Sequence, residues 1–452
     1  MTIAEKIADF CLSTGFEDLP SAVIATVKSA FADYIGIACL GAQNKASDAV
    51  ADYIRLVNGT EQGLCIRKQM MAPMELAGLI NAQMGHMDDF DDSGIPGHTS
   101  AILGGICVAL KDYCNLSGKD MIRGYALGME VEFRVGQVLM DSLVQHGFTC
   151  TPVFGCIGAV VTAACLLKLN REEFVNAIAI VVSDTGGVPV NFGSDCKPYQ
   201  VGLAAAAGIR SSLAAKAGLN GRPDAIEGKG GYAQLYCGKT IDGNAIDFSK
   251  DKWLVAQSGI VIKQYPCCLG NQGAAVGLFS LMDSGEIDPD EIAHIDVGLC
   301  YLANASLTFT EPVNVTEARF SVNFVLANIM LKRYLGLKSF DQRVVDDPEI
   351  REKMKIVSRQ HHPELKDVYA DETMPTILTI TLKDGSEKRF DSRLPKFCEG
   401  ANFAVLNEQI RKKFNDCTAD FIDEKTSNDL FERLMNLEKD QSLEWLTQAF
   451  IG

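Results

Sequence analysis

Residues 81–101, NAQMGHMDDFDDSGIPGHTSA, decide the layout of the first half of the chain, because a dense polar cluster in this segment separates two predicted helices. The segment holds two histidines, four aspartates and two serines beside three glycines and one proline, which break regular structure. Residues 72–85 upstream repeat apolar side chains at helical spacing, and residues 100–113 downstream have the pattern of a buried helix. We therefore predict a tight polar connection between two core helices, where the N–H groups of a helix start can bind an anion.

Two interpretations of this polar cluster stay open from the sequence. Titratable groups held between two core helices are candidates for proton-transfer chemistry. Alternatively, the aspartates only cap the next helix and solvate a loop, as most acidic runs do. Asp89 and Ser93 are four residues apart and can face one ligand, whereas Asp91 and Asp92 are assigned to capping. His98 follows a Pro-Gly pair, so its ring can face a cleft from a helix start, or it is a solvent-exposed loop histidine.

Composition limits the class of protein. A chain of 452 residues is expected to form two or three domains. It has no run of about 18 apolar residues, the length that a membrane span needs, and its first residues, MTIAEKIADF, do not resemble a secretion signal. The fifteen cysteines are scattered apart from the pair Cys267 and Cys268, which predicts reduced thiols in the cytoplasm. No closely grouped cysteines suggest an iron–sulfur cluster, and we expect no metal or organic cofactor.

The net charge of −16 argues against nucleic acid or an anionic membrane as a partner. An anionic substrate would then need a locally basic pocket. Lys197 stands before Pro198 at the head of a Gly/Ala-rich helix, where a lysine either solvates a loop or binds a carboxylate. Lys263 and Lys229, in a possible domain junction and a glycine-rich turn, have the same two interpretations.

The chain is predicted to be mainly α-helical. Residues 1–258 repeat apolar side chains at spacings of three and four, several of them on nearly all sides, as in a large helical bundle. Residues 259–394 are of α+β character: residues 295–302 predict a strand, residues 318–336 and 346–358 predict helices, and residues 376–391 predict a hairpin that turns at Asp384-Gly385. Helical periodicity returns in residues 395–452.

Five motifs, in order, resemble the MmgE/PrpD family. The family's H-x-x-D-F-D-D-T and H-P-S elements look like residues 86–93, HMDDFDDS, and 98–100, HTS. Its G-F-H-P-T-x-x-x-G element looks like residues 147–155, GFTCTPVFG, and its G-x-x-x-K-P looks like residues 193–198, GSDCKP. Its L-E-G-x-x-G-F and K-x-F/Y-P elements are similar to residues 226–232, IEGKGGY, and 263–266, KQYP. Each motif is weak alone, but five in order are specific.

The resemblance implies a large all-helical domain, to which the C-terminal tail returns, a smaller α+β lid, a cleft between them and a homodimer. It also implies a small anionic di- or tricarboxylate as the substrate. On that basis we assign His98 as principal acid/base, Asp89 as the group that orients or shares its proton, and Ser93 as a further catalytic residue. Lys197 and Lys263 are expected to bind carboxylates, with Lys229 and Tyr265 as additional substrate contacts.

The sequence also departs from the family pattern. Decarboxylase-type members have a histidine where this chain has Thr149, and another where it has Cys268. An aromatic hydroxyl is expected near Phe324, which has none. We expect Thr149 to contact the substrate, and His146, three residues earlier, to supply a substitute imidazole.

The predicted function is a cofactor-independent lyase of the 2-methylcitrate dehydratase type, which removes a proton next to a carboxylate. An epimerase or isomerase like iminodisuccinate epimerase needs the same base and no leaving group, so it is the nearest alternative. Decarboxylation of the cis-aconitate type fits less well because two family imidazoles are absent. Outside the enzymes, a family member that binds a carboxylate without turnover is the alternative.

Overall fold

The computed structural model describes residues 1–365 and 374–451, and it is mainly α-helical, as predicted. The helices of the first part of the chain are α1 (Ile3–Ser13), α2 (Ser21–Gly41), α3 (Lys45–Val57), α4 (Met74–Met84), α5 (Thr99–Leu110), α6 (Gly118–Gln145), α7 (Cys150–Leu166), α8 (Arg171–Val181), α9 (Cys196–Lys216), α10 (Tyr232–Cys237) and α11 (Leu254–Gln257). Those of the middle part are α12 (Leu269–Asp283), α13 (Tyr301–Ser306), α14 (Val315–Ala318), α15 (Val322–Lys332), α16 (Gln342–Val345) and α17 (Pro348–Met354). The tail forms α18 (Phe403–Thr418), α19 (Glu424–Met435) and α20 (Glu444–Phe450).

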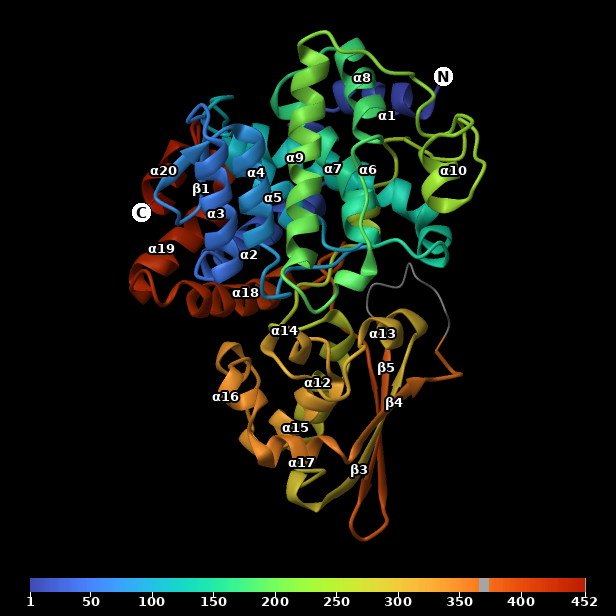
Figure 1. The fold of residues 1–452 in the computed structure, drawn as a ribbon, viewed down its shortest axis with the longest axis vertical. Helices are drawn as coiled ribbons and strands as arrows, with labels where there is room; N and C mark the ends of the chain where they lie inside the picture. Colours follow the sequence, from blue (N-terminus) through green and yellow to red (C-terminus); the bar gives the residue numbers. More distant parts are fainter. Residues whose placement is uncertain (366–373, 452) are drawn as a thin grey trace.

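Two large hydrophobic cores organise these elements. One contains side chains from Ile3 to Ile260 together with side chains from Phe397 to Phe450. The other contains side chains from Cys267 to Ile380. In Figure 1 the tail helices α18 to α20, in red, lie with the helices of the first part of the chain, and the sheet and helices α12 to α17 lie below. Of the tail helices, α18 and α19 pack against α2. The domain limits near residues 258 and 394 stay predictions.

The second core contains a four-stranded sheet made of β3 (Ile292–Leu299), β4 (Val357–His361), β5 (Thr376–Leu382) and β6 (Glu387–Ser392). The order of the strands is β4-β3-β5-β6. The predicted hairpin is present: β5 (Thr376–Leu382) and β6 (Glu387–Ser392) are antiparallel, and the turn glycine Gly385 has a φ of +84° that favours glycine. The helix predicted over residues 346–358 is too long. It ends at Met354, and β4 (Val357–His361) then runs parallel to β3 (Ile292–Leu299), because pairing with β3 satisfies the backbone of this stretch and buries Val357 in the second core.

The first part is not entirely helical, contrary to the prediction. β1 (Gly63–Cys65) and β2 (Met70–Ala72) form a short antiparallel pair that packs on α4 and α5. Strands of three residues are too short for a period of two to be visible in the sequence.

The helices around the polar cluster pack closely through small residues. α7 packs against α6 and α9, and α4 packs against α5 and α9. A Cβ atom on Gly202 of α9 would lie 2.5 Å from the carbonyl oxygen of Leu79, and one on Gly208 would lie 2.5 Å from the Cβ of Ala159. Glycine at these two positions therefore lets α9 lie against both α4 and α7, which fixes the helix starts described below.

Helix α2 is, within the described residues, the one helix that is long and apolar enough to cross a membrane, judged by length and composition alone. In its most apolar window, 78% of the residues are buried inside the protein. It packs against α4, α5, α6 and α18, as a core helix does.

Candidate active site

The polar segment between α4 and α5 is buried. All four aspartates and both histidines of residues 86–98 lie inside the protein, with only His98 partly exposed. Two backbone hydrogen bonds join Ser93 to Val261, so the segment is fixed to the chain that leads into the second core. This burial excludes the interpretation of the run as a solvated loop, because buried carboxylates need partners.

The backbone of the segment is held in an unusual conformation at Asp89. Its φ is +49°, in the left-handed region that a residue with a side chain rarely adopts. Such strain persists only where the surrounding contacts enforce it, and it clusters at functional sites.

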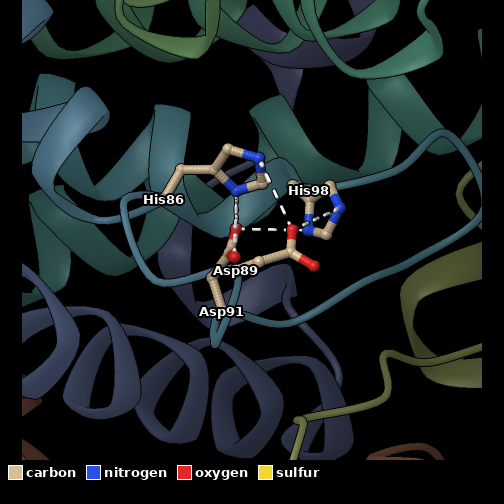
Figure 2. Close-up of side chains that lie close together, drawn as sticks. All are labelled: His86, Asp89, Asp91 and His98. Atoms are coloured by element: carbon tan, nitrogen blue, oxygen red, sulfur yellow. Dashed lines mark hydrogen bonds and ion pairs between the residues drawn. The ribbon is translucent and has the colours of Figure 1, made fainter. Parts of the chain in front are cut away.

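Asp91 binds both imidazole rings of the segment (Figure 2). Its carboxylate oxygens lie 2.9 Å from Nδ1 of His86, and Oδ2 lies 3.2 Å from Nδ1 of His98. The rings themselves are 4.4 Å apart between centroids. Burial acts to raise the pKa of Asp91, but the neighbouring His86 and His98 outweigh it and hold that pKa well below its ordinary value. Asp91 therefore stays ionised, and it is not the helix cap predicted from the sequence.

His98 is oriented through its Nδ1 atom. This atom also lies 2.9 Å from the carbonyl oxygen of Asp92, and a carbonyl can only accept, so Nδ1 carries the proton. Among the described residues Nε2 has no hydrogen-bond partner, and the nearest carboxylate oxygen, Oδ1 of Asp89, is 4.0 Å away. Nδ1 is thus fixed as the donor, and the lone pair of a neutral His98 lies on Nε2, as a general base requires.

Asp89 lies between two lysines. Its Oδ1 accepts a hydrogen bond of 2.6 Å from Nζ of Lys197, and its Oδ2 lies 3.3 Å from Nζ of Lys263. Burial alone would raise the pKa of Asp89, but the two ammonium groups lower it far below its ordinary value. Asp89 is therefore an ion-pairing and orienting group, and the alternative that it shares a mobile proton does not fit this environment.

Lys197, the second residue of α9, completes the cluster. Besides Asp89, its ammonium donates to Nε2 of His86 over 2.8 Å, which leaves one of its three N–H donors for another acceptor. The ammonium also lies 5.6 and 5.0 Å from the ring centroids of Phe192 and Phe320. Burial lowers the pKa of His86 to about 4, so this ring is neutral and accepts the bond from Lys197.

A cavity of about 210 Å³ opens next to this cluster. Its walls come from both hydrophobic cores: Ile95, Met140, Phe148 and Val201 from the first, and Cys268, Phe320 and Met374 from the second. His86, Asp89, Ser93, His98 and Lys197 line it as well. The sequence-predicted catalytic residues His98, Asp89, Ser93 and Lys197 are therefore brought to one cavity, although α9 is more than a hundred residues from the segment.

Three helices begin at this cavity. Their N-cap residues, His98 of α5, Thr149 of α7 and Cys268 of α12, form no capping hydrogen bond with their own side chains, and all three line the cavity. The first turn of α5 is capped by Asp92 instead, but the N–H groups and the positive dipole ends of α7 and α12 face the space. An anion can be bound here although Lys197 is the one lysine or arginine among the described residues that line the cavity.

Thr149, the predicted substrate contact, lies at the cavity wall. It is only 8% exposed, and its Oγ1 has no hydrogen-bond partner in the described structure. A buried hydroxyl without a partner is costly, so it marks a position where a ligand atom can bind.

Four other predicted contacts do not line the cavity. Lys263 is buried behind Asp89 and donates to the carbonyl oxygen of that residue over 2.7 Å, because the left-handed turn directs this carbonyl toward it. Tyr265 stacks on Phe279 in the second core. His146 caps the end of α6 on the surface, where its Nδ1 lies 3.1 Å from the carbonyl oxygen of Ser142, and Lys229 is exposed in its turn. Cap and turn geometry thus keep His146 and Lys229 away from the cavity.

Two functional candidates were missed by the sequence reasoning. His86 was used only as a motif position, and Asp91 was assigned to a helix cap. The signal for both was present, since the family-like element begins at His86 and contains Asp91. Phe324 is buried in the second core against Phe340, so it is not at the cavity.

Asp92 and Glu132 are two further buried carboxyls, which bind the neighbouring hydroxyls of Ser100 and Thr99 at the start of α5. Asp92 accepts a hydrogen bond from the Ser100 hydroxyl and a longer one of 3.4 Å from its N–H, so it does cap the first turn of α5, as predicted. Burial raises the pKa of Asp92 to about 8, with a further rise from Asp91, and burial raises the pKa of Glu132 to about 8. Both carboxyls can therefore hold a proton near neutral pH.

His86, Asp89, Asp91 and His98 offer ligand atoms within 4.8 Å of one another, the one such group among the described residues (Figure 2). Their donor atoms are already engaged, however. Two lysine ammoniums bind Asp89, and His86 uses both ring nitrogens on Asp91 and Lys197. A divalent cation would have to displace the Lys197 ammonium, so this arrangement fits a metal ion poorly.

Comparison with known proteins agrees with the motif order. The model of the MmgE/PrpD N-terminal domain matches residues 5–243, and the model of the MmgE/PrpD C-terminal domain matches residues 265–437. Cis-aconitate decarboxylase of Mus musculus is 24% identical over 464 residues, which cover 100% of this chain and 94% of that protein. Cis-aconitate decarboxylase of Homo sapiens is 23% identical over 468 residues, which cover 100% of this chain and 95% of that protein. The chain therefore belongs to the MmgE/PrpD family.

Proposed function

We propose that this protein is a cofactor-independent lyase of the dehydratase type that acts on a small di- or tricarboxylate. The observation that carries the proposal is the orientation of His98: the Asp92 carbonyl fixes the proton on Nδ1, and Nε2 has no hydrogen-bond partner among the described residues at the cavity. The two cis-aconitate decarboxylases are lyases, and their similarity to this chain over its full length supports an enzyme of this class.

In the proposed step, Nε2 of His98 removes a proton from the carbon next to a substrate carboxylate. The Asp91 carboxylate, 3.2 Å from Nδ1, stabilises the imidazolium that forms. The carbon–oxygen bond then breaks to give a carbon–carbon double bond, and the imidazolium returns its proton to the leaving hydroxyl, which departs as water. No other group has to gain or lose a proton over the cycle.

The carboxylates of the substrate are proposed to bind in two places. One accepts the unused N–H donor of Lys197, whose position is fixed by Asp89 and His86. The other faces the starts of α7 and α12 and the unpartnered hydroxyl of Thr149. These donors are strongest where charge develops on the carboxylate during proton removal, in a cavity with mostly apolar walls.

Decarboxylation is a second candidate, favoured by the two relatives with that activity. It breaks a carbon–carboxylate bond and requires a proton donor for the carbanion. Burial raises the pKa of Cys268 to about 11, so this residue is a protonated thiol at neutral pH and lies at the cavity where it can supply that proton. Thr149 and Cys268 in place of two family histidines favour dehydration, which needs no second imidazole.

The test is proton exchange and elimination in deuterated water, followed by NMR, with a panel of 2-hydroxy tricarboxylates, their dehydrated forms and four-carbon dicarboxylates. Elimination or hydration supports the dehydratase, and release of carbon dioxide supports the decarboxylase. Exchange without elimination indicates an epimerase or isomerase. If no acid reacts but one raises the unfolding temperature, the protein binds a carboxylate without turnover, and the proposal is wrong. The His98→Asn variant serves as the negative control.

A further inference from the structure

A lysine from the C-terminal tail lies directly behind the active-site segment. Lys413 of α18 is 7% exposed. Its ammonium donates to the carbonyl oxygen of Phe90 over 2.6 Å and to that of Lys263 over 3.0 Å, and it lies 2.9 Å from Oδ1 of Asp33 on α2. It also stands 3.9 Å from the centroid of the Phe90 ring. One ammonium thus joins four segments that are far apart in the chain.

Two of these contacts, the hydrogen bonds to the carbonyls of Phe90 and Lys263, hold residues that adjoin the acid/base cluster. Phe90 separates Asp89 from Asp91, the carboxylates that hold Lys197 and the two histidines. Lys263 in turn donates to the carbonyl oxygen of Asp89. Consecutive carbonyls of the segment, those of Asp89 and Phe90, are therefore each bound by a buried lysine.

These bonds act where the backbone is strained. The left-handed φ of Asp89 requires outside contacts that enforce it. If the carbonyl of Phe90 is released, the segment can relax and the carboxylates of Asp89 and Asp91 can turn away from Lys197 and His98. A displacement of about 1 Å of a catalytic group is enough to reduce a rate by about a hundredfold.

We propose that Lys413 is a positioning residue for the acid/base cluster: by binding the carbonyls of Phe90 and Lys263 it holds Asp89 and Asp91 in register with Lys197 and His98. The inference rests on the proposed function for its effect on rate, but its effect on the geometry of the two imidazoles can be measured without a substrate. It also gives the tail a part in a site to which it contributes no lining residue.

A purely structural role is the competing explanation, because a buried ion pair that loses one partner destabilises a protein. Lys413→Met alone would leave Asp33 as an unpaired buried carboxylate, so the decisive variant is the double substitution Asp33→Asn with Lys413→Met. It removes both charges and keeps the side-chain volumes, yet it still lacks the donor to Phe90 and Lys263. Lys412→Met is the matched control, since Lys412 is exposed on the same helix.

The first measurement is steady-state kinetics with the carboxylic acid of the panel that the wild type converts fastest. Each variant is first shown to be folded by circular dichroism. For the double variant we expect kcat to fall by about 10 to 100-fold, as for residues that orient a catalytic group, while KM rises by less than kcat falls because the starts of α7 and α12 still bind a carboxylate. Lys412→Met should match the wild type. A folded double variant with the wild-type kcat overturns the proposal.

The second measurement uses no substrate. Long-range proton–nitrogen spectra of histidine-labelled protein report the ring nitrogens, and His86→Gln and His98→Asn identify the two resonances. The double variant should shift both resonances and leave those of His146, His294, His361 and His362 in place. If no acid reacts with the wild type, the proposed function fails and this spectrum alone decides: shifted His86 and His98 signals support the positioning role, and unchanged signals overturn it.

Discussion

The ammonium nitrogen of Lys197 lies 2.8 Å from Nε2 of His86, across 111 residues of chain. The bond needs a neutral imidazole, and burial provides one by lowering the pKa of His86 to about 4. His86 therefore directs the lysine, and His98, whose Nε2 has no hydrogen-bond partner in the described part of the chain, is left for proton transfer. Two histidines twelve residues apart thus have different tasks, which their positions in the sequence do not reveal.

His98→Asn should lower kcat by about 10² to 10⁴-fold, the usual contribution of a general acid or base. Binding should persist, because asparagine keeps a polar group of similar size and Lys197 is unchanged. Steady-state kinetics and a thermal-shift assay with the same acid measure the two effects. His146→Asn is the control, since that ring is exposed and outside the cavity. Full turnover by His98→Asn would mean that another group is the base.

Lys197→Met should raise KM by at least as much as it lowers kcat, since the ammonium is assigned to the substrate carboxylate in both ground and transition states. Losing a hydrogen bond to a charged group is expected to raise KM by about 10 to 100-fold. Lys229→Met, on an exposed side chain, should leave both constants unchanged. An unaltered KM in Lys197→Met would remove this lysine from substrate binding.

Thr149→Val tests the second carboxylate position. Valine has nearly the same shape, and the Thr149 hydroxyl has no partner within the described protein, so the unfolding temperature should not fall. If the hydroxyl binds substrate, KM should rise by about 3 to 10-fold, the value of one hydrogen bond. Kinetics that match the wild type would show that no substrate atom binds the hydroxyl.

Glu132→Gln should make stability less sensitive to pH. Burial raises the pKa of Glu132 to about 8, against about 4.3 for an unfolded glutamate. Between these values the folded state binds more protons than the unfolded state, so the contribution of this group to stability is lost as the pH rises from about 4 to about 8. Glutamine does not titrate. The free energy of unfolding of the variant, relative to that of the wild type, should therefore be higher at pH 8.5 than at pH 5.

Urea unfolding at the two pH values measures this difference. Glu172→Gln is the control, because Glu172 is exposed on α8 and its substitution should have the same effect at both pH values. A Glu132→Gln effect that does not change with pH would show that this carboxyl titrates normally in the folded protein.

Local sequence determined the helices on either side of the polar segment, the position of Lys197 in the first turn of α9, and the hairpin that turns at Gly385. Each depends on side-chain periodicity or turn chemistry within about twenty residues, which the sequence displays directly. The motif order pointed to the family, and with it to His98, Asp89, Ser93 and Lys197 as neighbours.

Tertiary structure alone decided what each of these groups does. The left-handed turn at Asp89 directs its carbonyl to Lys263, which takes that lysine away from the cavity, and the buried position of Asp91 makes it the partner of both imidazoles. His146 and Lys229 look equally suited in the sequence, yet they lie at the surface. Roles of this kind depend on burial and on partners a hundred or more residues away, because desolvation and neighbouring charges set which group is neutral, which is ionised and which is free to react.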